Sequence, residues 1–332
     1  MKRPLFHRHA VLAGLALITA SLAAVAGAAQ QPSPRYPVKP IRAIIAQEAG
    51  SSIDTNIRVI APLLGEALGQ LLIVDNRPGA GGTLGMTIGA AAAPDGYTLV
   101  GVGSPQMIAP FVFKKLKYDV SRDFVPIARY VVSQNVFVVA PNFPATNVKG
   151  FVDLLRTKRG QLNMSTAGPG SASHLAGVYF NSLTGIEAAT VHYKGGGAAV
   201  IAIVSGESQY LITPMPAVLA QIRAGRLKPL GVGGESRAPQ LPQVPTIAEA
   251  GVAGYRSVGW TGLLMPKGVP PQYAALVAAK LRDVMAMPAV REQILNAGGE
   301  PGLLAGAEFG QFMRDEMERF GRVAKAAGLK LD

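Results

Sequence analysis

The chain has 332 residues, of which 49% are apolar and only 16% are charged. These proportions exclude a disordered chain and provide for a large core in two domains of ordinary size. The chain has no cysteine, so it has no disulfides. Its formal charge is +12, but the basic residues do not cluster enough to indicate nucleic-acid binding.

Residues 1–28 are predicted to form a secretory signal peptide. Three basic residues fall within the first eight positions, an apolar run extends from Ala10 to Ala26, and Ala26-Gly27-Ala28 offers an Ala-x-Ala cleavage pattern. A retained membrane anchor is the alternative, but the run is short for a spanning helix. We therefore predict cleavage near Ala28 and a periplasmic location. Removing the three basic residues of this segment lowers the formal charge from +12 to +9.

The part of the chain after the signal peptide begins with alternating strands and helices. A short apolar run with β-branched residues predicts a strand at 41–46, and apolar residues recur at helical spacing from Ile57 to Leu68. Further strands are predicted at 71–74 and 97–102, with an alanine-rich helix ending near Ala93 between them. This β-α-β-α-β order predicts a parallel sheet covered by helices.

The same alternation restarts after Arg129. Predicted strands lie at 136–140, 162–166, 189–193, 209–212 and 227–232, and predicted helices lie at 148–156, 174–183, 198–204 and 217–224. The tail from Pro271 to Leu331 is predicted to be helical, with apolar stripes that pack on the core. Two α/β units in one chain predict two lobes with a cleft between them, where the carboxyl ends of the strands meet.

Three strand-to-helix junctions are rich in Gly and Ser, at Gln47–Asp54, Thr166–His174 and Tyr193–Gly197. The first turn of a helix has unpaired N–H groups and a partial positive charge, so such junctions favour carboxylates or phosphates. The alternative is that Gly and Ser only shape the turns, with Ser52 or Asp54 as a helix N-cap. Three such loops in two lobes favour a binding cleft.

The common sequence motifs of enzymes are absent or incomplete in this chain. The sequence has no Gly-x-Ser-x-Gly elbow and no phosphate-binding loop, and the dinucleotide fingerprint starting at Gly168 has Ser173 in place of its third glycine. After the signal peptide the histidines are His174 and His192, and neither belongs to a metal motif. His174 either lines the cleft or has a capping or core role. We predict no enzyme, no cofactor and no metal site.

Seven segments carry a family resemblance, and they lie in order from residue 36 onward. They are Tyr36–Arg42, Asp75–Gly82, Ala93–Leu99, Gly170–Gly177, Tyr193–Gly196, Val244–Gly251 and Trp260–Leu264. Together these motifs resemble the Bug (TctC) family, the substrate-binding proteins of tripartite tricarboxylate transporters. The resemblance covers residues 36–331, nearly the whole predicted mature chain.

The resemblance implies an α/β periplasmic binding protein fold, type II-like, with two doubly wound lobes joined by a hinge. Lobe 1 is expected at 36–131 plus 256–332, and lobe 2 at 132–255. The implied ligand is a small mono- or dicarboxylate, including amino and aromatic acids, and the implied partner is a permease of one large and one small subunit. A monomer without nucleic-acid partners is expected. A sensory carrier that presents its bound form to a membrane sensor kinase is the alternative function.

The family's ligand lies between the first-lobe loop and the second-lobe Ser-His loop, which places the expected binding residues in this chain. The first lobe is expected to contribute Gln47, Glu48, Gly50, Ser51, Ser52 and Asp54, with Ser104, Pro105 and Gln106 at the border. The second lobe is expected to contribute Thr166, Gly168, Gly170, Ser171, Ser173 and His174, with Thr213 and Met215 at the border and Lys194 and Gly195 at the rim.

The sequence departs from the family pattern at two of these positions. Glu48 lies in a loop that is usually rich in Pro, Ala and Gly, and a carboxylate there repels a carboxylate ligand if it points inward. Either Glu48 points to solvent, or the ligand carries an amine or hydroxyl that pairs with it. Thr213 stands where Asp or Asn is common.

Overall fold

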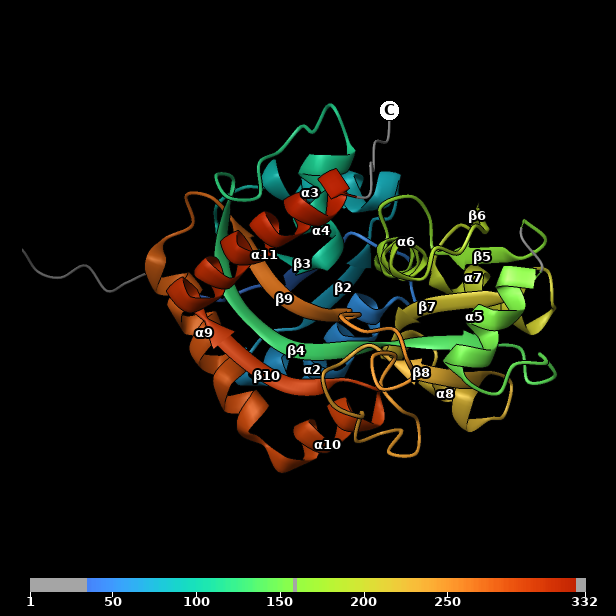
Figure 1. The fold of residues 1–332 in the computed structure, drawn as a ribbon. Helices are drawn as coiled ribbons and strands as arrows, with labels where there is room; N and C mark the ends of the chain where they lie inside the picture. Colours follow the sequence, from blue (N-terminus) through green and yellow to red (C-terminus); the bar gives the residue numbers. More distant parts are fainter. Residues whose placement is uncertain (1–34, 158–159, 327–332) are drawn as a thin grey trace, which may run out of the picture. The chain divides into compact units, whose positions relative to one another are not determined.

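The computed structural model describes residues 35–157 and 160–326 (Figure 1), so the predicted signal peptide and its cleavage site lie outside the described residues. From Pro37 onward the described residues belong to one compact unit. Its strands join into one mixed sheet in the order β2-β1-β3-β9-β4-β7-β5-β6, with β10 and β8 each paired to β4. Strands and helices are named below as they are labelled in Figure 1.

The first three strands form the predicted parallel unit. β1 (Ile41–Ile45) pairs in parallel with both β2 (Leu72–Asn76) and β3 (Thr98–Gly103). The crossovers are α2 (Ser52–Leu68) and, after a short 3-10 turn at Ala80–Gly82, α3 (Thr83–Ala90). β1 is buried on both faces, which explains why it is a nearly continuous apolar run and does not alternate. The predicted β-α-β-α-β order is confirmed.

One long strand, β4 (Phe124–Val139), lies in the middle of the sheet and connects its two parts (Figure 1). Along most of its length it pairs antiparallel with β9 (Val258–Pro266) and β10 (Glu300–Ala305). Its last residues pair antiparallel with β7 (Tyr210–Pro214) and β8 (Lys228–Val232). We call β1, β2, β3, β9, β10 and their helices the first half, and β5 to β8 and their helices the second half. The sequence predicted only the C-terminal end of β4.

The second half repeats the parallel arrangement. β5 (Asn163–Thr166) pairs in parallel with β6 (Ala189–His192) and β7. The helices of this half are α5 (Val148–Thr157), α6 (Ala172–Thr184), α7 (Gly196–Val204) and α8 (Leu219–Arg223), with a 3-10 turn at Met215–Ala217. Its core is an aromatic cluster in which the Phe137 ring meets those of Phe151 and Phe180 edge to face, 4.7 and 5.0 Å between centroids.

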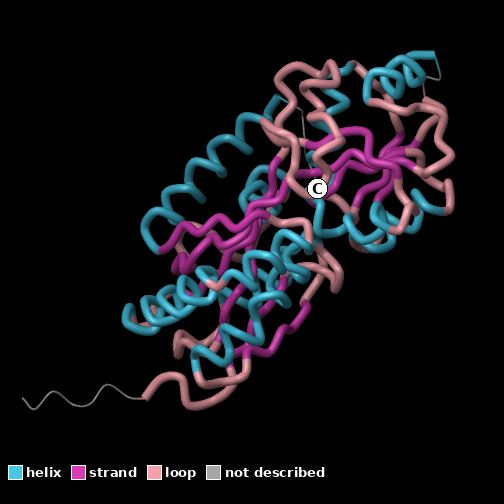
Figure 2. Tube along the Cα trace, turned by 90° about the horizontal axis from the view of Figure 1, so that it is seen from below, coloured by secondary structure: helices cyan, strands magenta, loops and turns pink. Residues whose placement is uncertain are grey.

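The C-terminal segment returns to the first half. It forms α9 (Pro271–Ala286), α10 (Pro288–Asn296), β10 and α11 (Gly306–Ala326), and α11 packs against α4 (Ser104–Val112). Phe309, Met313 and Phe320 of α11 are buried in the first-half core, as their helical stripe predicted. The prediction of a wholly helical tail is wrong at β10, where Glu300–Ala305 pairs with β4. Figure 2 shows helices flanking the strands.

None of the helices formed by the described residues combines the length and the apolar character that a membrane-spanning helix requires.

Candidate ligand-binding site

A cavity of about 570 Å³ lies between the loops of the two halves. The first half contributes the loop after β1, the glycine-rich loop after β2 and the start of α4, and the second half contributes the loops after β5, β6 and β7. The floor includes Ser133 of β4 and Trp260 of β9. This volume is within the range of small-molecule sites.

Helix N-termini from both halves border the cavity. Within the described residues, first-turn or N-cap residues of five α-helices line it: Ser51 of α2, Gly82 of α3, Ser104 of α4, Ser171 of α6 and Gly196 of α7. Each such helix start presents N–H groups that lack intrahelical partners and carries a partial positive charge. The cavity is therefore suited electrostatically to an anionic ligand.

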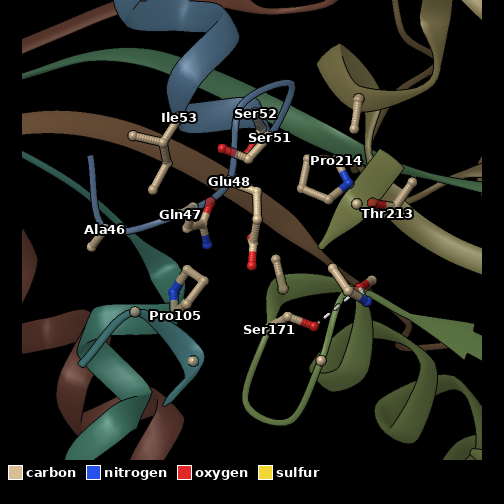
Figure 3. Close-up of a pocket in the computed structure, with 18 of the residues that line it drawn as sticks. Ala46, Gln47, Glu48, Ser51, Ser52, Ile53, Pro105, Ser171, Thr213 and Pro214 are labelled. Atoms are coloured by element: carbon tan, nitrogen blue, oxygen red, sulfur yellow. Dashed lines mark hydrogen bonds between the residues drawn. The ribbon is translucent and has the colours of Figure 1, made fainter. Parts of the chain in front are cut away.

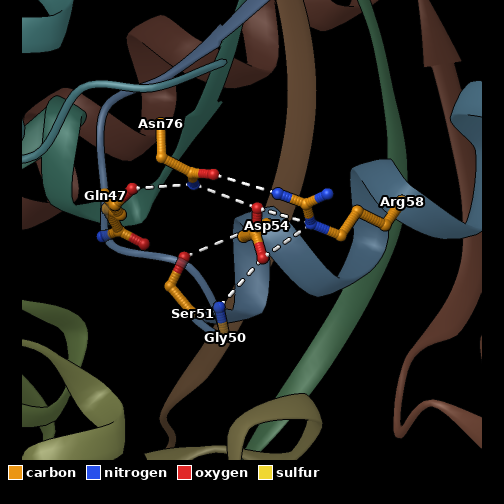
Figure 4. Close-up of polar contacts among 6 residues, drawn as sticks. All are labelled: Gln47, Gly50, Ser51, Asp54, Arg58 and Asn76. Carbon is orange, nitrogen blue, oxygen red and sulfur yellow. Dashed lines mark hydrogen bonds and ion pairs between the residues drawn. The ribbon is translucent and has the colours of Figure 1, made fainter. Parts of the chain in front are cut away.

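The loop after β1 is held by the buried carboxylate of Asp54 (Figure 4). This carboxylate accepts hydrogen bonds from the Gly50 N–H at 2.9 Å and from Arg58 Nε and Asn76 Nδ2, both at 3.0 Å. Asp54 N–H in turn donates to Ser51 Oγ, the N-cap of α2, at 3.3 Å. Burial alone raises the pKa of Asp54, but the hydrogen bonds from Arg58, Gly50 and Asn76 outweigh it and lower the pKa. Asp54 thus fixes the loop.

The loop after β5 has the same construction with a different acceptor. Ser171 is the N-cap of α6 and accepts a hydrogen bond from His174 N–H at 3.2 Å. The Gly170 N–H donates to His174 Nδ1 at 3.1 Å, and the Ala167 N–H donates to Ser173 Oγ at 2.9 Å. His174 is only 7% exposed, and burial, followed by the nearby His192, lowers its pKa to about 4. The imidazole is therefore neutral at pH 7 and serves as an acceptor for the loop.

Two buried polar atoms at the start of α4 lack partners in the described structure. Ser104 is 6% exposed and lines the cavity, and its Oγ has no hydrogen-bond partner. Gln106 Oε1 accepts from the Gly103 N–H at 2.9 Å, but Gln106 Nε2 has no partner. Buried polar groups are nearly always paired, so the unpaired Ser104 hydroxyl is an exception within a residue that lines the cavity.

The two halves approach each other closely at two glycines. A Cβ on Gly195 would lie 2.9 Å from Glu48 Cγ and 3.1 Å from Glu48 Oε2. A Cβ on Gly81 would lie 2.9 Å from the backbone oxygen of Pro169. At Gly81 the contact is with backbone and is shorter than real Cβ contacts, so glycine is needed for this approach, whereas at Gly195 the contact is with the flexible Glu48 side chain, which can move.

The charged side chains of the cavity wall are Glu48 and Lys194, one from each half. Figure 3 shows the Glu48 carboxylate pointing into the space between its own loop and the second-half residues Ser171 and Thr213. Glu48 thus lies in the cavity wall and is half-buried. Lys194 is exposed.

The structure brings eleven of the nineteen expected binding residues together around this cavity. They are Gln47, Glu48, Ser51, Ser52, Ser104, Pro105, Gly168, Ser171, Ser173, Lys194 and Thr213. The other eight lie behind or beside the lining: Gly50, Asp54, Gln106, Thr166, Gly170, His174, Gly195 and Met215. Asp54 and His174 support the loops, and Met215 is buried in a second-half core cluster.

Several lining residues were not among those expected from the sequence. The largest group is the loop after β2, with Pro78, Gly79, Gly81 and Gly82, and single residues include Phe113, Ser133 and Trp260. The loop carried a visible signal, since its glycine-rich run is one of the family motifs. Ser133 and Trp260 had none, because they come from strands whose pairing depends on the rest of the fold.

Comparison with known proteins gives this geometry a context. A family model described as "Tripartite tricarboxylate transporter family receptor" matches residues 56–329. The chain belongs to this family. The protein BugT of Bordetella pertussis is 31% identical over 319 residues, which cover 96% of this chain and 98% of BugT.

Two solved relatives share the fold and were determined with carboxylates. An R. palustris protein with adipate is 28% identical, with a TM-score of 0.87, and the match covers 90% of this chain and 100% of that one. MatC from Rhodopseudomonas palustris with bound malate is 29% identical, with a TM-score of 0.82, and covers 87% of this chain and 99% of MatC. This receptor-family protein therefore has the periplasmic binding protein fold expected from its sequence motifs.

Proposed function

We propose that this protein is the extracytoplasmic solute-binding receptor of a tripartite tricarboxylate-type transporter and captures a small carboxylate in the cavity between its two halves. The observation that carries the proposal is the meeting of helix N-termini from both halves at one cavity, at Ser51, Ser104 and Ser171. Two solved relatives, determined with adipate and with malate, support a carboxylate as the ligand class.

The proposed mechanism is hinged closure around the ligand. Residues 36–131 with 256–332 form one lobe and residues 132–255 the other. The chain passes from the first lobe to the second within β4 and returns just before β9. A ligand that contacts both lobes stabilises the closed form through its higher affinity for that form. The contacts at Gly81 and Gly195 are the places where closure brings the lobes together.

The proposed partners are the large and small permease subunits, and the proposed location is the periplasm after removal of residues 1–28. The protein acts as a carrier and does not transform its ligand. The alternative partner is a membrane sensor kinase that reads the same closed form. Co-purification with the permease subunits and with the kinase, each with and without ligand, distinguishes these two partners.

Native mass spectrometry of freshly purified protein tests the function. The expected result is a co-purified small acid that leaves on denaturation, and isothermal titration of the unfolded and refolded protein with that acid then gives saturable one-to-one binding. Recovery of the acid unchanged after prolonged incubation is expected for a carrier. If no mono- or dicarboxylate binds, or if the acid is converted to a product, the proposed function is wrong.

A further inference from the structure

Glu48 places a carboxylate inside the candidate site without an internal partner. The side chain is half-buried, lines the cavity and reaches across to the backbone at Gly195. In the described part of the chain its carboxylate makes no hydrogen bond and no ion pair (Figure 3). Lys194, the other charged lining residue, forms no ion pair with Glu48 within the described residues.

The contrast with Asp54, a few residues away, shows that this lack is specific to Glu48. Asp54 is buried but fully compensated by Arg58, Asn76 and the Gly50 N–H (Figure 4). An ionised carboxylate that loses water without gaining a partner is strongly unfavourable. Glu48 lies against Gly195 at the start of α7, whose positive end compensates part of this charge, and a donor on a ligand in the cavity supplies the direct partner that the side chain lacks.

The chemistry of that partner follows from the charge. A ligand carboxylate next to Glu48 is repelled, whereas a hydroxyl donates one hydrogen bond but leaves the negative charge in place. An ammonium supplies three donors and the opposite charge. The helix starts at Ser104 and Ser171 remain available for the anionic end of the same ligand.

Resting on the proposed function, we propose that Glu48 is a specificity-determining residue that receives an ammonium group of the ligand. The ligand is then a small zwitterionic acid, with its carboxylate at the helix starts and its ammonium at Glu48. Plain di- and monocarboxylates of the same length are the disfavoured members of each series.

Three ligand series that differ at one carbon test this inference by isothermal titration at pH 7. They are succinate, malate and aspartate; glutarate, 2-hydroxyglutarate and glutamate; and propionate, lactate and alanine. In the series that binds tightest, the amino member is expected to bind at least tenfold more tightly than the unsubstituted member, with the hydroxy member between them. In Glu48→Gln this preference is expected to fall at least tenfold.

The matched control is Glu187→Gln, which removes the same charge from an exposed position outside the cavity lining and is expected to leave the preference unchanged. Glu48→Gln is nearly isosteric and loses no internal contact, so its melting temperature is expected to equal that of the wild type. The wild-type ratios test the proposal even if the variant is poorly folded.

Each other outcome has a definite meaning. An unsubstituted acid that binds as tightly as its amino analogue overturns the role of Glu48 but leaves carboxylate capture intact. A hydroxy acid that equals the amino acid overturns the requirement for a positive charge. If no member of any series binds, the inference fails, and the co-purified acid then decides separately whether the protein captures a carboxylate.

Discussion

The loops after β1 and after β5 are built on one plan but with different charges. In each, a glycine with φ in the left-handed region, 79° at Gly50 and 71° at Gly170, precedes a serine N-cap. In each, the residue four positions after the glycine accepts the glycine N–H, through a carboxylate at Asp54 and a neutral imidazole at His174. The same backbone geometry is therefore held by an anion in the first half and by an uncharged ring in the second.

This difference makes the electrostatic potential of the cavity asymmetric, with more negative charge on the side of the first half. The first half contributes Glu48 to the lining and Asp54 behind it, whereas the second half contributes Lys194 and the neutral His174. The second half therefore adds no carboxylate of its own to the lining near the start of α6. Two loops with the same backbone geometry can thus favour oppositely charged groups of one ligand.

The largest expected effect is a loss of folding stability at acid pH. The pKa of His174 is lowered to about 4, below its ordinary value of 6.5, so between these values the unfolded chain binds a proton that the native protein excludes. The stability that depends on the neutral ring is complete above pH 6.5 and falls as the pH drops toward 4. The expected loss is about 3 kcal/mol in total, from about 1.4 kcal/mol per pKa unit.

Urea unfolding measured at intervals between pH 7 and pH 4 checks this slope. His192 also has a pKa lowered by burial, so it contributes a loss of the same sign. Asp54, whose pKa is lowered, loses its stabilising contribution only when the pH falls below the range of an ordinary Asp. In His174→Gln the slope should shrink relative to the wild type. An unchanged slope would mean that the ring is not held neutral by the fold.

The next effect concerns the anionic acceptor of the first loop. In Asp54→Asn the charge-assisted hydrogen bond from Arg58 is lost, and one of the donors around the side chain faces an amide N–H₂ group instead of an oxygen. The free energy of unfolding is expected to fall by about 2 kcal/mol. Thermal and urea unfolding measure it. Asp95→Asn, which loses only the exposed pair with Lys39, is the control and should change stability by less than about 0.5 kcal/mol.

A further test of the two loops replaces the neutral acceptor His174 by a carboxylate. In His174→Asp the new carboxylate can accept the Gly170 N–H as Asp54 accepts that of Gly50, but it places a negative charge behind the second loop. Affinity for the tightest carboxylate ligand is expected to fall about tenfold, which corresponds to about 1.4 kcal/mol. Isothermal titration at pH 7 measures it, with His174→Asn as the uncharged control. Equal affinities for the two variants would show that charge in this loop is irrelevant to the ligand.

The smallest effect is expected at the unpaired hydroxyl of Ser104. Ser104→Ala removes a hydroxyl that has no partner within the described protein, so stability should be unchanged or slightly higher. Ligand affinity should fall by about fivefold, because one hydrogen bond contributes about 1 kcal/mol. Ser182→Ala, on an exposed surface of α6, is the control for affinity. A loss of stability with normal affinity would assign Ser104 a structural role.

The sequence predicted the local features of this molecule better than the long-range ones. The parallel units were readable because each strand and helix carries its own apolar periodicity and its own turn residues. β9 and β10 were not predicted, and β10 falls in a segment expected to be helical. Both strands exist because β4 offers an edge for pairing, and this tertiary requirement overrides local preference.

The same distinction holds within the candidate site. Ser51 and Ser171 were expected at the cavity, since a glycine-serine loop before a helix is visible in the sequence. The sequence left open whether Asp54 and His174 line the cavity or support their own loops, because a side chain can turn from the cavity to its own loop without any change in sequence pattern. In the structure both support their loops. The close approach of Gly195 to Glu48 joins residues from different halves and required the fold.

A crystal structure of the protein with its co-purified ligand is the decisive experiment on where the carboxylate binds. The account predicts one ligand in the cavity between the halves, with carboxylate oxygens about 2.7–2.9 Å from N–H groups in the first turn of α4 or α6. A ligand outside this cavity would contradict it, as would a ligand whose carboxylate faces solvent while the helix starts contact only apolar atoms.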